Sequence, residues 1–438
     1  MEDPRSVARS ALEPPARVDG LRIGRVKLLH VITRLAGGSG GNTLLSSLGM
    51  DPSRYEVWVA AMPGGPLLEE AEGAGVTCVR VPHLREKISP LSDLLALWQL
   101  VGLMRRERFT VVHTHSAKAG VLGRLAARLA HVPVVVHPFH SFGFQSSSSA
   151  RGQRVLLALD RMCRPLADAY VGVAPQIVRE AIELRLAPVG RIWVVPSAVE
   201  LDDIPYGPDP SIRLELGIAE EVAVVGTVGR LVAQKAPLDF VRMAAMVNEA
   251  RPGTRFVMVG DASLESVPLE ERTKEEARRL GVDVLFTGFR ADAPRIASMF
   301  DVFVITSLYE GLGRGLTEAM ASGRAIAATA VNGIPDVVEP GSTGLLAAPG
   351  DPSGMARCVI WLLDHPEEAR RMGAQGQQRV RSLFKPSTMC SMLDEIYAEM
   401  LGAREGSLAG RGSHLNGHHA NGRARDHRLE WPQGPSER

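Results

Sequence analysis

The chain has 438 residues, of which 45% are hydrophobic and 23% are charged, and its formal net charge is +1. This length exceeds one ordinary hydrophobic core and predicts two domains, and the balanced charge gives no reason to expect a nucleic-acid partner. No apolar run is long enough to span a membrane, and the amino terminus lacks the apolar core of a signal peptide. The four cysteines are scattered without a C-x-x-C pair, which favours reduced thiols over a disulfide framework or a zinc site. We therefore expect a cytoplasmic protein.

Residues 1–24 mix proline, arginine and acidic residues and are expected to form a disordered leader. The apolar run 26–32 predicts a first strand, and a glycine-rich segment at 35–42 leads from it into a helix. This segment is not G-x-G-x-x-G, and no acidic residue stands where a dinucleotide ribose would need it, so a dehydrogenase is disfavoured. The segment is either a tight strand-to-helix turn or a surface that a substrate approaches closely at Gly40 and Gly41.

Further apolar strands separated by helical stretches are expected in the first half of the chain, at 55–60, 77–81, 111–114, 132–137, 169–173 and 191–199. Strands and helices that alternate in this way predict a parallel, doubly wound sheet. The helical stretch 91–105 is amphipathic, and the basic residues at 105–108 follow it. It packs on the sheet or contacts a membrane surface, and the second case would place the protein at the inner face of the cell membrane.

Two histidine-rich segments, 113–118 and 137–144, end neighbouring predicted strands. Because the carboxyl ends of parallel strands line the ligand crevice, we expect one histidine of these segments to face a substrate. No cysteine or carboxylate lies in either segment to complete a coordination shell, so no metal site is predicted. Lys118 is either a solvated lysine at a helix start or a contact for a phosphate of the acceptor.

The segment 205–210 is rich in proline, glycine and aspartate and is the candidate linker. A second series of strands and helices follows it, with strands at 222–230, 255–260, 284–288, 302–306 and 325–329. The chain is therefore divided into a first Rossmann-like domain, a second Rossmann-like domain, a helix that crosses back to the first domain and a disordered tail, at 25–205, 211–385, 386–403 and 404–438. In the tail, His418 and His419 are expected to be solvated.

The stretch 302–323 combines a buried strand, a glycine-rich loop and a helix, an arrangement that directs backbone N–H groups at an anion. Glu310 and Glu318 lie eight residues apart, one in the loop and the other about two turns into the predicted helix. Carboxylates repel phosphate and suit hydroxyl groups, while Arg230 and Lys235, at the end of another strand, suit a diphosphate. A ligand with phosphates in the middle and hydroxyl groups at both ends is a nucleotide sugar.

With these motifs the chain resembles the retaining glycosyltransferases of the GT-B fold, family 4, over about residues 25 to 402. The resemblance rests on G-R-L-x-x-x-K at 229–235, T-G-F-R at 287–290, Y-E-G-L-G-x-x-x-x-E-A-M at 309–320 and N-G-I-P-D-V-V-E-P-G-x-T-G-L-L at 332–346, with weaker matches at 111–120 and 132–144. It implies an α/β fold of two facing Rossmann-like, doubly wound domains, with a C-terminal helix crossing back to the first. Ala236 departs from the pattern, since the family commonly has glycine there.

The resemblance also implies roles for individual residues. Arg230 and Lys235 would hold the donor diphosphate, and Glu318 would bind the ribose hydroxyls. Glu310 would bind hydroxyls of the transferred sugar, with backbone N–H groups from the loop. The remaining implied contacts are Gly311, Leu312 and Gly313 in that loop, Phe289 and Arg290 beside the base, and Gly40 and Gly41 beside the phosphates.

The implied catalytic histidine remains open. His140 matches a position where the family often has H-G near the reacting carbon, but Ser141 replaces the glycine and His137 lies three residues upstream. Both histidines are therefore candidates.

The histidine segments contain no carboxylate, so a covalent glycosyl-enzyme of the two-carboxylate kind is not suggested. The family implies instead a front-face, metal-independent transfer, in which the leaving diphosphate takes the proton of the acceptor. The acceptor would be a glycan or lipid-linked intermediate of cell-envelope polysaccharide synthesis, and the base is uracil or guanine. The competing hypotheses are a nucleotide-sugar epimerase and a non-catalytic subunit that binds the same ligand.

Overall fold

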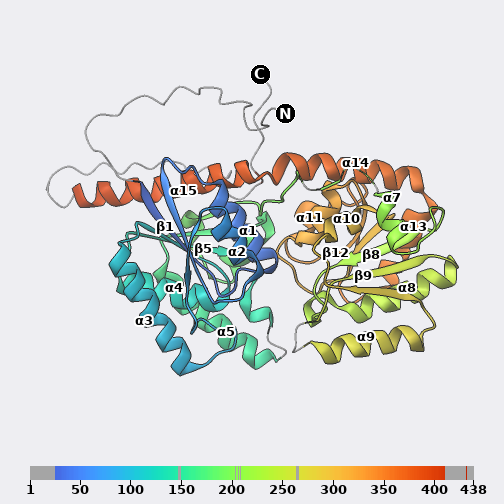
Figure 1. Cartoon of the computed structure of the whole chain (residues 1–438), viewed down its shortest axis with the longest axis horizontal. Coiled ribbons are helices and arrows are strands. Elements are labelled where there is room, and N and C mark those ends of the chain that lie inside the picture. The colour runs from blue at the N-terminus through green and yellow to red at the C-terminus, as the bar shows by residue number, and fades with distance from the viewer. Residues whose placement is uncertain are drawn as a thin grey trace, which may run out of the picture.

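The computed structural model describes residues 25–146, 149–202, 204–205, 207, 209–262, 266–409 and 431. The expected leader, and the expected tail with His418 and His419 apart from its first residues and Trp431, lie outside this range. Two α/β domains stand side by side, and two long helices, α14 (Pro366–Leu383) and α15 (Pro386–Ala409), run along one edge of both (Figure 1).

The first domain holds a parallel seven-stranded sheet in the order β3-β2-β1-β4-β5-β6-β7. Its strands are β1 (Val26–Val31), β2 (Tyr55–Ala61), β3 (Thr77–Arg80), β4 (Val111–Thr114), β5 (Val134–Phe139), β6 (Ala169–Gly172) and β7 (Ile192–Val194). Its helices are α1 (Gly37–Gly49), α2 (Pro66–Gly73), α3 (Pro90–Glu107), α4 (Ala117–Leu129), η1 (Gly143–Ser146), α5 (Ala150–Met162), η2 (Arg164–Leu166), α6 (Pro175–Glu183) and η3 (Val189–Arg191). The central strands β4, β5 and β6 are buried along their whole length, which explains their unbroken apolar runs.

The second domain holds a parallel six-stranded sheet in the order β10-β9-β8-β11-β12-β13. Its strands are β8 (Val224–Val228), β9 (Arg255–Val259), β10 (Val284–Gly288), β11 (Val302–Ile305), β12 (Ala325–Thr329) and β13 (Leu345–Ala347). Its helices are α7 (Pro210–Glu215), η4 (Ala233–Lys235), α8 (Pro237–Ala250), α9 (Val267–Arg279), α10 (Ala293–Ser298), α11 (Arg314–Ala321), α12 (Ile334–Val337) and α13 (Pro352–Asp364). Strand order reverses beside β1 in the first sheet and beside β8 in the second, and such switch points are where open α/β sheets bind ligands.

Proline is the first residue of α2, α3, α6, α7, α8, α13, α14 and α15. Its fixed φ suits the first helical position, and its missing N–H would have no partner there. Most of the long helices therefore begin with proline.

Helix α15 returns to the first domain, as the predicted fold requires. It packs Met389, Leu393 and Tyr397 against the first sheet, where they join one apolar cluster with β1 and β4 residues. Asp394 accepts a hydrogen bond of 2.5 Å from the hydroxyl of Tyr55 and pairs with Arg54. These contacts fasten the end of the second half of the chain onto the first domain and confirm the two-domain prediction with its crossover helix.

Direct contacts also join the two domains. The backbone N–H of Gln176 donates to Asp336 (2.6 Å), and Arg179 pairs with the same carboxylate at 3.2 Å. Asn332 donates through Nδ2 to Glu180 (2.8 Å). The start of α6 in the first domain therefore meets the loop around α12 in the second. Among the described helices, none is long and apolar enough to cross a membrane.

Candidate active site

The loop after β8 carries the two predicted diphosphate ligands. Lys235 lies in η4, and Ala236 follows with a left-handed φ of 46°. This conformation is costly for a side-chain-bearing residue and free for glycine, which explains the glycine that the family commonly has at this position. The loop is fixed to the neighbouring one, because Thr306 donates through Oγ1 to the carbonyl of Lys235 (2.8 Å) and Gln234 donates to that of Tyr309 (3.0 Å).

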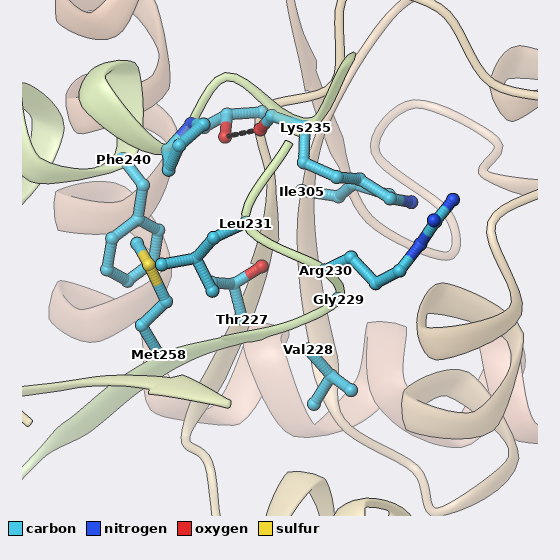
Figure 2. Close-up of a pocket in the computed structure, with 11 residues that line it drawn as sticks. Thr227, Val228, Gly229, Arg230, Leu231, Lys235, Phe240, Met258 and Ile305 are labelled. Carbon is cyan, nitrogen blue, oxygen red and sulfur yellow. Dashed lines mark hydrogen bonds between the residues drawn. The ribbon is translucent and has the colours of Figure 1, made fainter. Parts of the chain in front are cut away.

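Arg230 and Lys235 extend their side chains in the same direction from this loop (Figure 2). They line an open depression that Thr227, Gly229, Met258 and Ile305 also border. Arg230 is exposed, and the side chain of Lys235 is 25% exposed. Two cations that reach one opening from a rigid strand end suit an anionic ligand.

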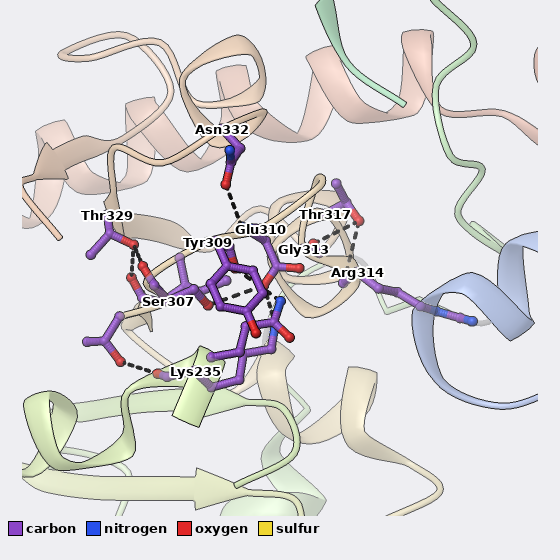
Figure 3. Close-up of polar contacts among 12 residues, drawn as sticks. Lys235, Ser307, Tyr309, Glu310, Gly313, Arg314, Thr317, Thr329 and Asn332 are labelled. Atoms are coloured by element: carbon purple, nitrogen blue, oxygen red, sulfur yellow. Dashed lines mark hydrogen bonds and ion pairs between the residues drawn. The ribbon is translucent and has the colours of Figure 1, made fainter. Parts of the chain in front are cut away.

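Lys235 and Glu310 form the central ion pair of the site, with Nζ and Oε2 2.5 Å apart (Figure 3). Ser307 donates to the same carboxylate oxygen at 3.2 Å, and the backbone N–H of Glu310 donates to Asn332 Oδ1 at 3.0 Å. Three groups from separate loops therefore hold Glu310 in place beside Arg230 and Lys235.

Glu318 lies in the first turns of α11, since that helix begins only at Arg314. The prediction that Glu318 stands about two turns into the helix was wrong, because residues 311–313 form a loop in which Gly313 has a φ of 79°. Arg314 donates to Glu318 Oε1 at 2.6 Å. Burial raises the pKa of Glu318, and the nearby guanidinium of Arg314 opposes this shift.

At Gly311 the backbone of the second domain lies directly against the backbone of the first. A Cβ added at this position would overlap the carbonyl oxygen of His140, and the Cβ of Gly333 would likewise overlap the carbonyl of Gly311. The two domains therefore touch closely where the loop that carries Glu310 passes the backbone of the predicted catalytic histidine.

Replacing Gly311 by Ala should slow transfer by about tenfold or more, since the new methyl group forces the two domains apart at the reaction centre. Binding of the nucleotide alone should change much less, because most of the predicted contacts to the nucleotide lie within the second domain. Steady-state kinetics and nucleotide titration measure the two effects. Gly402→Ala on α15, where an added Cβ meets nothing within 4 Å, is the matched control; equal transfer rates in both variants would contradict the prediction.

Histidines of three neighbouring strands form a hydrogen-bonded chain beneath the cleft. His140 Nε2 lies 3.1 Å from His115 Nδ1, and His115 Nε2 lies 2.9 Å from His30 Nδ1. His113 Nδ1 lies 2.5 Å from the Tyr397 hydroxyl on α15. Burial lowers the pKa of His140 to about 4 and that of His30 to about 3, so these rings are neutral at pH 7.

His137 and His140 have different surroundings. His137 is buried, bonds Thr114 Oγ1 at 2.9 Å and packs against Gly120 of α4. His140 is partly exposed and lies beside Gly311. The backbone carbonyl of His140 thus lies against the loop of Glu310, and a catalytic role of either histidine stays a prediction.

Nitrogen atoms of His30, His113 and His115 lie within 4.8 Å of one another, so these rings could hold a metal ion. The sequence did not indicate this group, since His30 lies on a strand more than eighty residues away from the other two. Within the described residues the group contains no carboxylate or thiolate. Metal independence of the reaction stays a prediction.

The other predicted contacts lie at the edge of the site or already contact other residues of the chain. Gly40 and Gly41 belong to α1, which begins at Gly37, so the expected glycine turn is helical. The guanidinium of Arg314 extends toward α1 (Figure 3) and occupies the place that a Cβ of Gly41 would take. Phe289 is 71% exposed, and its contact with a base stays a prediction.

Arg290 and Lys118 are bound to acidic partners. Arg290 donates to Asp292 (2.8 Å) and Glu215 (2.7 Å). Lys118 pairs with Asp93 and donates to the carbonyl of Lys87, and so joins α4 to α3. A role of Lys118 toward an acceptor phosphate stays a prediction.

Arg314 lies near the site and was not singled out by the sequence analysis. A signal existed for it, since it is the first residue after a glycine-rich anion loop. Asn332 and His115 each lie in a segment that the sequence analysis described, the 332–346 motif and the 113–118 segment, but their bonds to Glu310 and His140 are tertiary contacts that no local pattern indicates.

Two facing parallel sheets, with paired cations and two carboxylates at the strand ends of the second, define a nucleotide-sugar-binding enzyme of the GT-B architecture. Comparisons with known proteins agree. Residues 209–379 match the model of the glycosyl transferases group 1, and residues 43–203 match that of glycosyltransferase family 4.

Among curated proteins, the chain is 29% identical to the UDP-Gal:alpha-D-GlcNAc-diphosphoundecaprenol alpha-1,3-galactosyltransferase of Escherichia coli, over 86% of this chain and 98% of that protein. It is 30% identical to the D-inositol 3-phosphate glycosyltransferase of Thermobispora bispora, over 69% of this chain and 74% of that protein. Among solved structures, that of Anabaena Alr3699/HepE in complex with UDP and glucose has a TM-score of 0.74 at 20% identity, over 85% of this chain and 100% of that one. The chain belongs to glycosyltransferase family 4, and it is a retaining enzyme that uses a nucleotide-sugar donor.

Proposed function

We propose that this enzyme transfers a hexose from a UDP-linked donor to a lipid-linked glycan intermediate of cell-envelope polysaccharide synthesis. The observation that carries the proposal is the Lys235–Glu310 pair, with Arg230 beside it and Glu318 on the following helix. The E. coli relative, named for a UDP-galactose donor and a diphosphoundecaprenol-linked acceptor, aligns over nearly its whole length and supports both choices.

In the proposed reaction, Arg230 and Lys235 stabilise the negative charge that develops on the leaving diphosphate. The α11 N-terminus and the N–H groups of Gly311, Leu312 and Gly313 supply further donors. Glu310 binds hydroxyls of the transferred sugar, and its pairing with Lys235 sets the position of both groups.

Glu318 binds the ribose hydroxyls, and Phe289 with Arg290 flanks the base. Arg314, whose guanidinium lies against Gly41 of α1, adds a third cation for the donor phosphates.

His140 faces the reacting carbon from the acceptor side. Because its pKa is lowered to about 4, it is neutral at working pH and acts as a hydrogen-bond partner and not as a cation. In a front-face transfer, the leaving diphosphate oxygen takes the proton of the acceptor hydroxyl as the new glycosidic bond forms on the same face. No protein nucleophile is required.

Thermal unfolding with a panel of nucleotides tests the donor. A ligand present at one hundred times its Kd stabilises the folded state by about 2.7 kcal/mol, so UDP should raise the melting temperature by several degrees and GDP should raise it much less. Glu318→Ala should abolish the UDP shift. Glu276→Ala on α9 removes a carboxylate that pairs with Arg242 and Arg279, and this variant should retain the shift. A larger shift with GDP would contradict the choice of base.

A further inference from the structure

Helix α3 exposes a continuous apolar stripe. Leu91, Leu94, Leu95 and Trp98 are spaced to share one helix face, and they are 72%, 50%, 43% and 58% exposed. Ile88, in the preceding loop, is 75% exposed. The opposite face of the helix, with Ala96, Leu100, Leu103 and Met104, packs into the core of the first domain. The exposed leucines and the tryptophan are therefore not required for packing the core of the first domain.

Helix α5 adds a second stripe on the same side of the first domain. It buries none of its residues, and Val155, Leu159 and Met162, at spacings of four and three, are 53%, 47% and 73% exposed. Figure 1 shows α3 and α5 on the outer side of the first domain, with α4 between them. Helix α4 contacts α3 extensively, and its Arg124 pairs with Asp160 of α5, so the three helices form one surface.

Exposed apolar residues of the second domain are dispersed by comparison. Leu214, Met246, Val267 and Trp361 lie on four different helices. Single exposed apolar residues are normal on a protein surface, whereas two helical stripes on one side of the same domain indicate a binding surface.

Basic residues outnumber acidic ones beside these stripes, where Glu86, Asp93, Glu107 and Asp160 also lie. Arg85 and Lys87 precede α3, and Arg105 and Arg106 occupy its last turn. On α5, Arg151, Arg154 and Arg161 are exposed beside the apolar residues. Apolar side chains that include a tryptophan, framed by lysine and arginine, suit the boundary between acyl chains and anionic head groups.

We propose that the α3–α5 surface, defined as Ile88, Leu91, Leu94, Leu95, Trp98, Val155, Leu159 and Met162 with their flanking basic residues, docks on an anionic lipid bilayer. This inference rests on the proposed function for its purpose, since a lipid-linked acceptor must reach the cleft from a membrane. The chain supplies the connection: the loop after β5 carries His140 at the cleft and leads through η1 into α5. A docked first domain would thus hold the acceptor side of the cleft close to the bilayer.

Sedimentation with lipid vesicles tests the surface using the full chain. We expect the protein to bind vesicles of phosphatidylglycerol and phosphatidylcholine in equal parts, to bind pure phosphatidylcholine far less, and to dissociate as salt rises. The double variant Leu94→Glu with Trp98→Glu should lower the partition coefficient by about tenfold or more, because each change removes apolar area and adds charge repelled by the lipid. Leu214→Glu with Met246→Glu, in the second domain, is the matched control and should bind like the parent chain.

Each outcome has a definite meaning. No binding of the parent chain to anionic vesicles, or equal loss in both double variants, would overturn the docking surface, and binding of a protein partner through Leu94 and Trp98 without vesicle binding would replace it. The UDP thermal shift, measured in both double variants, separates this inference from the proposed function. Vesicle binding without any nucleotide binding would leave the surface standing and reject the donor assignment, whereas a normal UDP shift without vesicle binding would do the reverse.

Discussion

Glu310→Gln lowers the rate of sugar transfer by about 10²–10³-fold and leaves the folded structure intact, which is the expected result if Glu310 and Lys235 act together on the donor. The substitution keeps the size of the side chain and removes the charge that faces Lys235 Nζ at 2.5 Å. Lys235 is then free to move away from the diphosphate, and the hydroxyls of the sugar lose their charged acceptor. Steady-state transfer with a fixed acceptor measures the loss, and circular dichroism verifies the fold.

Two comparisons make this prediction specific. Glu339→Gln breaks another ion pair of the second domain, that with Arg379 at 2.6 Å, and should leave transfer unchanged. Because Glu310 and Lys235 act as one unit, the double variant Glu310→Gln with Lys235→Met should be no slower than the slower single variant. Full turnover in Glu310→Gln would reject the assignment of the site.

The second prediction with a large expected effect is that the folded protein loses stability in mild acid. Burial lowers the pKa of His30 to about 3 and of His140 to about 4, and it lowers the pKa of His113, His115 and His137 well below the ordinary value. In the unfolded chain each histidine titrates near pH 6.5, as an exposed histidine does.

The direction in which stability changes with pH follows from the number of protons that the folded and unfolded states bind. Below about pH 6.5 the unfolded state takes up protons that the folded state refuses, so stability is complete above that pH and falls as the pH drops toward 4. Each such group contributes up to about 1.4 kcal/mol per pH unit, and a few of them are enough to unfold a domain of ordinary stability. We expect acid unfolding between pH 6 and 4 that begins in the first domain.

Hydrogen exchange followed by mass spectrometry measures this order of unfolding. Segments of β1, β4 and β5 should lose protection before those of β8 and β11. His30→Gln should make the dependence on pH shallower, while His365→Gln, at an exposed position of the second domain, should leave it unchanged. Simultaneous loss of protection in both domains would contradict the assignment to the histidines of the first.

Much of the donor site could be predicted because its signals are local. Arg230, Lys235, Glu310 and Glu318 each lie a fixed number of residues from a buried apolar strand, and parallel strands bring their carboxyl ends to one edge of the sheet. The helix starts could not be predicted as well. Helix α1 begins with glycines and α11 follows one, and glycine is compatible with a loop or with a helix, so packing decides between them. At α1, contacts with α15 and with Arg314 favour the helix.

By itself, the sequence determined the two doubly wound sheets, the crossover helix and the residues proposed here for the donor site, since these follow from hydrophobic periodicity and from spacing within single motifs. Only the tertiary structure decided which distant groups meet. His30 joins His115 and His140 because β1 pairs with β4, and Gly311 touches His140 because the two domains face each other. The structure also decided which apolar residues of α3 face solvent: the helix carries apolar side chains on most of its circumference, and only the position of the sheet and α4 divides the buried from the exposed.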